Sequence, residues 1–179
     1  MSRFWQSVLA AAGIVLLVSG APARGDEKDK AALEVAKTDL AKAEANLKRS
    51  EAELKRTKEL LRTRAVTASD YDESEAQRDI ARAEVSVKQE AVNRFVKPAK
   101  DRAEVEVAFA KADLVLTESR LKLADVLLQR ARGLFAQKGI NEEELKAVEK
   151  RFMDSQKDVD ERKRAVAQAI ALLKKKSGS

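Results

Sequence analysis

Two short stretches of the sequence decide the fold: residues 64–71 read RAVTASDY, and residues 138–145 read KGINEEEL. Thr67 and Asn141 are favourable N-cap residues, because their side-chain oxygens can accept a hydrogen bond from the backbone amide three residues on. An acidic residue stands at that third position in each stretch and can bond back to the amide of the cap, which is the capping-box arrangement. These acids are Asp70 and Glu144. Each stretch therefore predicts a helix that starts directly after a turn.

Apolar residues flank both caps at the spacing of a hydrophobic staple, one residue before the cap and four residues after it. They are Val66 with Tyr71, and Ile140 with Leu145. Gly139 can adopt the left-handed conformation that ends a helix, whereas Ala65 adopts it less easily. We therefore expect the first turn to be more strained than the second.

On both sides of each turn, apolar residues recur every seven positions, which is typical of a coiled coil. In the helices before the turns, the large residues are Leu33, Leu40, Leu47, Leu54 and Leu61, and then Val107, Leu114, Leu121, Leu128 and Phe135. The helices after the turns carry Tyr71, Val85 and Val92, and then Leu145, Phe152, Val159, Val166 and Leu173. Small residues such as Ala36 and Ala110 follow three positions after the large ones. Each helix pair is thus expected to form an antiparallel hairpin whose thin seam leaves no pocket.

The two hairpins correspond to each other at an offset of 74 residues, where Lys37, Asp39 and Leu40 reappear as Lys111, Asp113 and Leu114. One continuous heptad pattern would not give this offset, because it is not a multiple of seven. The pattern therefore predicts an internal duplication. Pro98 ends the first copy, since proline disfavours the helical conformation of the residue before it. Such a short connection places both turns at one end of the molecule.

The predicted fold class is all-α, with two tandem antiparallel coiled-coil hairpins made of four long helices after an N-terminal signal peptide. The expected segments are a signal peptide over residues 1–25, hairpins over residues 26–97 and 98–176, and a disordered tail over residues 177–179. A single hairpin buries little apolar area for its length. We therefore expect the hairpins to pack on each other or on other subunits, and we expect a homo-oligomer.

The composition argues against catalysis. The 179 residues contain no His and no Cys, which removes imidazole bases, thiol nucleophiles and Cys/His zinc sites. The carboxylates are scattered over solvent-facing positions, and no glycine-rich phosphate loop is present. We predict no enzyme, no metal site, no cofactor and no small-molecule substrate. The 36 basic residues are evenly mixed with 30 acidic ones, so nucleic acid is not an expected partner.

The N-terminus has the features of a secretory signal. Arg3 precedes an apolar run over residues 8–18, and the small residues Ala21 to Ala23 follow it. The run is short of the roughly 20 residues that span a bilayer, so an uncleaved anchor is the weaker alternative. We expect cleavage near Ala23 to Gly25 and a periplasmic protein.

The stretch around the first turn resembles the helical hairpin of periplasmic adaptor proteins, the HlyD-like membrane fusion proteins of efflux and secretion systems. The resemblance implies a tip that docks on an outer-membrane channel through an Arg, a Leu four residues later and a Ser seven residues beyond that. Here Arg56, Leu60 and Thr67 keep the spacing, and Arg130, Leu134 and Asn141 keep it in the second hairpin. This sequence contains no strand-like segments that could form the lipoyl and β-barrel domains of that family.

The resemblance implies an adaptor-like component that contacts an outer-membrane channel or another coiled-coil envelope protein through the hairpin tips. In this interpretation the two arginines donate charged hydrogen bonds and the two leucines pack between partner helices. The alternative is that the leucines only close the hairpin's own core and the arginines are solvated. A second functional hypothesis is a periplasmic holding chaperone or an envelope-binding spacer, which the lysines at positions 174–176 favour.

Overall fold

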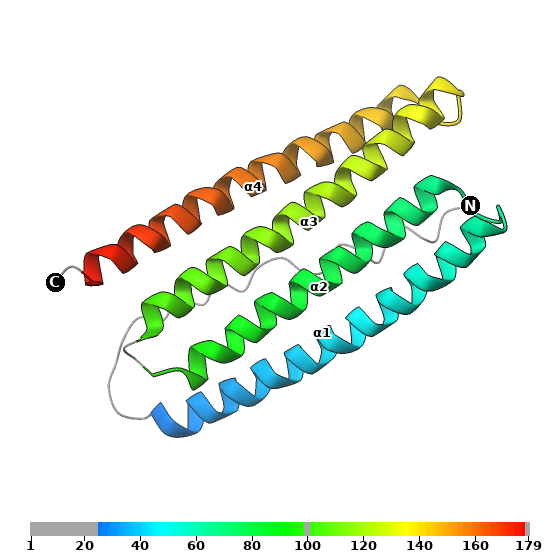
Figure 1. The fold of residues 1–179 in the computed structure, drawn as a ribbon. Helices are drawn as coiled ribbons and strands as arrows, with labels where there is room; N and C mark the ends of the chain where they lie inside the picture. Colours follow the sequence, from blue (N-terminus) through cyan, green and yellow to red (C-terminus); the bar gives the residue numbers. More distant parts are fainter. Residues whose placement is uncertain (1–24, 99–100, 178–179) are drawn as a thin grey trace.

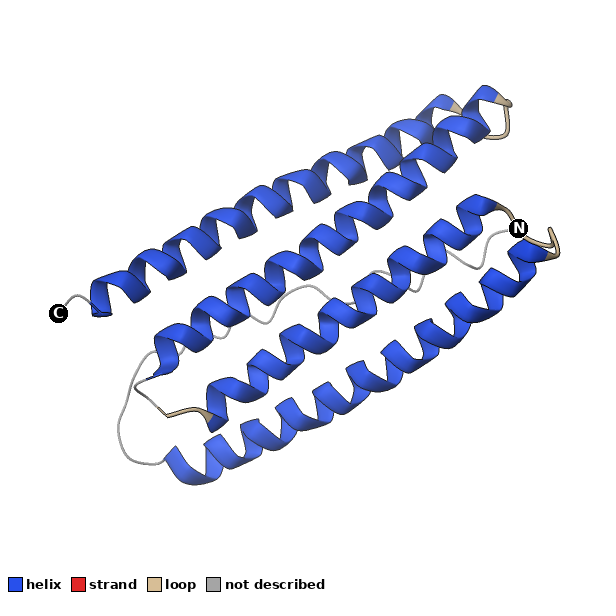
Figure 2. Ribbon diagram, viewed as in Figure 1, coloured by secondary structure: helices blue, strands red, loops and turns tan. Residues whose placement is uncertain are grey.

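The structure, a computed structural model, describes residues 25–98 and 101–177. This part of the chain contains four helices and no strand: α1 (Gly25–Arg62), α2 (Ala68–Val96), α3 (Arg102–Ala136) and α4 (Glu142–Ser177). The predicted all-α class of two helical hairpins is confirmed (Figure 2). The expected signal peptide lies outside the described residues, except for Gly25. Ser177, predicted as the start of a disordered tail, is the last residue of α4.

The four helices lie side by side in chain order, and each runs antiparallel to the next (Figure 1). Among the described helices, α1 contacts α2, α2 contacts α3 and α3 contacts α4, whereas α1 does not touch α4. The 38 residues of α1 extend for about 57 Å at 1.5 Å per residue. The molecule is therefore an open layer of long helices with α1 and α4 at its two edges. Both turns lie at one end of the layer, as the short connection at Pro98 predicted.

The seam residues predicted from the heptad pattern are at least half-buried in the structure, with one exception. Ala43, Val92, Leu128, Ala131 and Val159 are buried. Phe135 was predicted as a seam residue but is 41% exposed. It lies in the last turn of α3, where α4 has not yet begun to cover it.

The two hairpins pack on each other through α2 and α3, as expected. The apolar part of this contact uses a second stripe of α3 that the heptad pattern did not include. Val105, which is 1% exposed, and Leu116, which is 7% exposed, are its most buried large residues. Because α3 lies between α2 and α4, it needs an apolar stripe on two sides.

Ion pairs join α2 to α3 across the contact between the two hairpins. Along the half of this contact nearer the turns, α2 supplies acids and α3 supplies bases. Lys122 Nζ lies 3.0 Å from Asp79 Oδ2 and 3.5 Å from Glu75 Oε2, and Arg120 pairs with Glu84 at 3.6 Å. The hydrogen bond to Asp79 raises the pKa of Lys122 above its usual value. Near Pro98 the charges are exchanged, so that α2 supplies the base and α3 supplies the acid.

At that end Arg94 of α2 pairs with Glu106 of α3 at 2.6 Å, and its guanidinium lies 3.6 Å from the centroid of the Phe109 ring. Such pairs contribute little net stability at the surface, but they discriminate between alternative registers.

Candidate functional site: the two hairpin tips

We call residues 56–74 the first tip and residues 130–148 the second tip. In both, the helix before the turn ends in a Schellman motif, in which amides beyond the helix bond back to its last carbonyls. In the first tip, the amides of Arg64 and Ala65 donate to Leu61 O and Leu60 O at 3.0 and 2.9 Å. In the second tip, the amides of Lys138 and Gly139 donate to Phe135 O and Leu134 O at 2.9 and 2.8 Å. The turns are thus bonded identically at positions 74 residues apart.

The prediction that Gly139 takes the left-handed conformation is wrong. The left-handed residues are Arg64 and Lys138, each with a φ of 58°. Gly139 lies one position later, where its φ is outside the left-handed region and its counterpart is Ala65. Because the same position bears the strain in both tips, the first turn is not more strained than the second.

Both predicted capping boxes are present. The Asp70 amide donates to Thr67 Oγ1 at 3.2 Å, and the Thr67 amide donates to Asp70 Oδ2 at 2.9 Å. In the second tip the Glu144 amide donates to Asn141 Oδ1, and the Asn141 amide donates to Glu144 Oε2, both at 2.9 Å. The Thr67 bonds, from backbone and then side chain, lower the pKa of Asp70 below its usual value, and Arg130 adds to this effect.

Thr67 and Asn141 therefore already use their side chains within the chain. The Thr67 hydroxyl accepts from the Asp70 amide and donates to Asp70 Oδ2 at 2.8 Å. The Asn141 carbonyl oxygen is occupied by the Glu144 amide. The third residue of the tip pattern thus shapes the turn, and contact with a partner depends on the surroundings of the arginine and the leucine in each tip.

The two arginines of the pattern have different surroundings. Arg130 Nη1 lies 3.2 Å from Asp70 Oδ1 and 3.1 Å from Glu73 Oε2, so it joins α3 to the start of α2. Arg56 is exposed and forms no ion pair with any residue that the structure describes. The reason is position, because α3 lies beside α2 in the layer, whereas the solvent-facing side of α1 has no helix next to it.

The two leucines also differ. Leu60 is half-buried, and its neighbour Leu61 is half-buried as well. Their counterparts Leu134 and Phe135 are 39% and 41% exposed. The first tip thus presents a cation without a partner, and the second tip presents more apolar surface beside a cation that is already paired.

The sequence analysis did not identify Asp70 and Glu73 as partners of Arg130. Asp70 was singled out only as a capping residue, and Glu73 was not singled out at all. The acidic start of α2 was visible in the sequence, but its pairing with α3 depends on the register between hairpins. That register is fixed by contacts distant in sequence.

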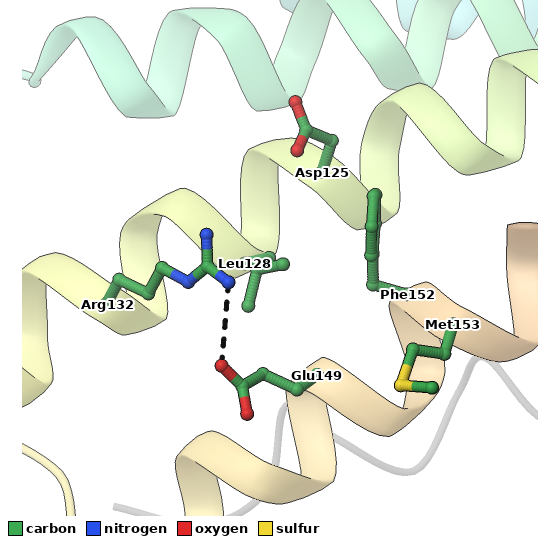
Figure 3. Close-up of a pocket in the computed structure, with 6 residues that line it drawn as sticks. All are labelled: Asp125, Leu128, Arg132, Glu149, Phe152 and Met153. Atoms are coloured by element: carbon green, nitrogen blue, oxygen red, sulfur yellow. Dashed lines mark ion pairs between the residues drawn. The ribbon is translucent and has the colours of Figure 1, made fainter.

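Two shallow grooves, both open to solvent, lie beside the seam between α3 and α4. The groove nearer the second tip has a volume of about 380 Å³. Leu128 and Phe152 form its apolar part, and Arg132 and Glu149 face each other across it with 3.5 Å between Nη2 and Oε1 (Figure 3). Met153, which is 56% exposed, stands at its edge.

The second groove has a volume of about 630 Å³ and lies toward the opposite end of the layer. It exists because alanines at positions 103, 110, 165 and 169 leave space between α3 and α4. Arg162 pairs with Asp113 across it at 3.0 Å. Neither groove places a nucleophile beside a base, so both are surface features between helices.

Among the residues that the structure describes, no group of three or more His, Cys, Asp or Glu side chains is arranged to hold a metal ion. The same residues include no helix that is both long and apolar enough to cross a membrane.

Comparison with known proteins agrees with the resemblance seen in the sequence. Residues 27–94 match the family model described as RND MFP, alpha-helical hairpin domain, where MFP denotes membrane fusion protein. The match spans α1, the first turn and nearly all of α2, and thus covers the first hairpin. No curated protein and no solved structure matches the chain. The first hairpin is therefore similar to the hairpin domain of membrane fusion proteins.

Proposed function

We propose that this chain is a periplasmic, adaptor-like structural component of an efflux or secretion assembly. The match of residues 27–94 to the hairpin domain of RND membrane fusion proteins is the observation that carries this proposal. Such hairpins belong to non-enzymatic adaptors that meet outer-membrane channels. The placement of both tips at one end of the layer supports it, because one partner can then contact both (Figure 1).

In this proposal the first tip makes the principal contact. Arg56 donates charge-assisted hydrogen bonds to carbonyl or carboxylate groups of the channel, and Leu60 packs between channel helices. Thr67 holds the turn. In the second tip, Leu134 and Phe135 add apolar contact, while Arg130 fastens the second hairpin to the first and Asn141 holds its turn.

A capture experiment tests the proposal. The purified chain is immobilised and exposed to a TolC-type outer-membrane channel from the same organism. We expect the wild type to retain the channel, and we expect the variant Arg56→Ala, Leu60→Ala, Arg130→Ala, Leu134→Ala to lose it while circular dichroism shows the same helix content. A matched control replaces the exposed residues Lys150, Met153, Lys157 and Leu172 of α4 by Ala and should retain the channel.

Retention of the channel by the fourfold tip variant would show that the tips are not the docking surface. If the wild type captures unfolded outer-membrane proteins and no channel, the chaperone hypothesis takes its place. The internal duplication and the homo-oligomer stay predictions, which the identical bonding of the two turns and the open edges of the layer support respectively.

A further inference from the structure

The layer has two open edges, which are the outward sides of α1 and α4 (Figure 1). Among the described helices, α1 contacts only α2, and α4 contacts only α3. Both edge helices carry an exposed apolar side chain, since Val35 of α1 and Leu172 of α4 are each 63% exposed. Single exposed apolar residues are common on proteins, so the charges of the two edges decide whether they form an interface.

The contact between α2 and α3 shows how one hairpin of this chain packs on another. There α3, which precedes a turn, lies antiparallel to α2, which follows a turn. In the half nearer the turns the bases belong to α3 and the acids to α2, as in the pairs of Lys122 with Asp79 and Arg120 with Glu84. The open edges belong to the same two kinds of helix, because α1 precedes a turn and α4 follows one.

The charges of the two open edges have this same distribution. Residues 42–49 of α1 read KAEANLKR, with three bases and one acid, and residues 154–161 of α4 read DSQKDVDE, with four acids and one base. The first segment lies 13–20 residues before the end of α1 at Arg62, and the second lies 12–19 residues after the start of α4 at Glu142. Because both turns are at one end of the layer, the two segments are level to within about 2 Å at 1.5 Å per residue.

Most of these charges have no strong partner within the chain. Four of them are exposed and form no ion pair with any residue that the structure describes: Lys48, Arg49, Asp158 and Glu161. Lys42 and Asp154 each pair with an exposed residue of their own helix, at 3.8 and 3.7 Å, and such pairs contribute little. The two remaining charges of minority sign, Glu44 and Lys157, are opposite to each other as well.

We propose that a second copy of this chain packs its α1 edge on the α4 edge of the first copy, with the turns of both copies at the same end. In this contact Lys42 meets Glu161 and Arg49 meets Asp154, because the members of each pair are level and both rows have a spacing of seven residues. Opposite charges along the whole contact favour this pairing of edges over the pairing of two like edges. The inference goes beyond the proposed function, since it names the surfaces that join two copies and needs no channel.

Apolar residues extend the contact away from the turns. Val35 lies between the levels of Ala165 and Leu172, which line the second groove. Nearer the turns, Arg56 and Lys150 come within two residues of the same level, and these like charges oppose contact. The interface therefore ends before the tips and leaves them accessible. Because it joins two different surfaces, each pair keeps one open edge of each kind, to which further copies can add.

Cysteine cross-linking tests this contact in the full chain, which has no Cys of its own. Thr38→Cys on α1 and Ala165→Cys on α4 place thiols at exposed positions on the same level of the two edges. We expect a mixture of the two single variants to form a disulfide-linked dimer under mild oxidation, and each variant alone to stay uncrosslinked. A mixture of Thr38→Cys with Lys111→Cys, an exposed position on α3, should give no dimer.

Charge reversal tests the ion pairs, with self-association measured by sedimentation velocity. Lys42→Glu with Arg49→Glu should weaken association about tenfold, as should Asp154→Lys with Glu161→Lys, because two attractions become repulsions. Combining all four changes should restore association to within about threefold of wild type.

The control Lys58→Glu with Lys111→Glu makes the same change in net charge outside the two segments. It should leave association unchanged, because neither lysine belongs to the proposed contact. An equal loss in this control would show that net charge, and not the pairing of the two edges, governs association.

Four other results would overturn the proposal. They are no cross-link in the mixture, a cross-link in either single variant alone, a cross-link within one chain of the double variant Thr38→Cys, Ala165→Cys, and no recovery on combining the four charge reversals. The second would show that like edges meet, and the third that the layer closes on itself. Failure here is distinct from failure of channel docking, because the fourfold tip variant should still form the cross-link when it carries these cysteines.

Discussion

The two hairpins have the same turns and different neighbours. Each turn has a Schellman motif, a left-handed basic residue and a capping box at corresponding positions. The helix before the first turn, α1, is at the edge of the layer, whereas its counterpart α3 is covered on two sides. Local sequence thus fixes the shape of a tip, and position in the layer decides which side chains that tip offers to a partner.

The largest expected effect compares matched core leucines. Leu128 of α3 is 3% exposed, and Leu54, its counterpart in α1, is half-buried. We expect Leu128→Ala to lower the free energy of unfolding by about 2–4 kcal/mol, because it leaves a cavity between tightly packed helices. Leu54→Ala should cost roughly half as much.

Urea denaturation followed by circular dichroism measures both changes. Equal losses would mean that α1 is covered as fully as α3 in solution, as the predicted homo-oligomer would do if another subunit packed on this edge of the layer.

The caps should give the next largest effect, and here the two tips should agree. Thr67→Ala and Asn141→Ala each remove a side-chain acceptor from a helix N-terminus, at a cost of about 1 kcal/mol. The same denaturation assay measures them, with Thr38→Ala on α1 as a control for the substitution. A loss at one tip only would contradict the finding that the two turns are built alike.

The next effect is smaller and is a gain in stability, expected when the left-handed residues are replaced by glycine. Arg64→Gly and Lys138→Gly should each raise the free energy of unfolding by roughly 0.5 kcal/mol, since glycine relieves the left-handed conformation but adds freedom to the unfolded chain. Gly139→Ala should be close to neutral, because alanine already occupies that position in the first turn. Thermal melting of the three variants distinguishes this assignment from one in which Gly139 bears the strain.

The smallest expected effect is a loss of stability at acidic pH through Asp70. The lowered pKa of Asp70 means that the unfolded chain binds the proton more readily than the folded chain. The stabilisation by this carboxylate is therefore complete above its usual pKa of about 4 and is lost as the pH falls further. The destabilisation by Asp70→Asn, measured in urea, should shrink between pH 7 and pH 3. A constant difference would show that the carboxylate charge plays no part.

The sequence predicted the elements whose causes are local. The two capping pairs, Thr67 with Asp70 and Asn141 with Glu144, each join residues three positions apart. The heptad stripes and the hairpin resemblance likewise depend only on the order of residues along one segment of the chain. The left-handed residue was misplaced by one position, because glycine was favoured on propensity although the Schellman geometry selected Lys138.

The part that could not be predicted depends on contacts between hairpins. Val105 and Leu116 face α2, and Arg130 meets Asp70 and Glu73, only because α2 and α3 pack in one particular register. Nothing near Arg56 or Arg130 in the sequence distinguishes them. Their difference arises from the layer as a whole.

The most direct test of this account measures the affinity of the outer-membrane channel for each tip separately. The double variants Arg56→Ala, Leu60→Ala and Arg130→Ala, Leu134→Ala remove matched residues from the two tips. Loss of a charge-assisted hydrogen bond is worth about 1.5–3 kcal/mol, so the first variant should weaken binding at least tenfold. The second should weaken it less than threefold; equal losses, or a larger loss at the second tip, would contradict the account.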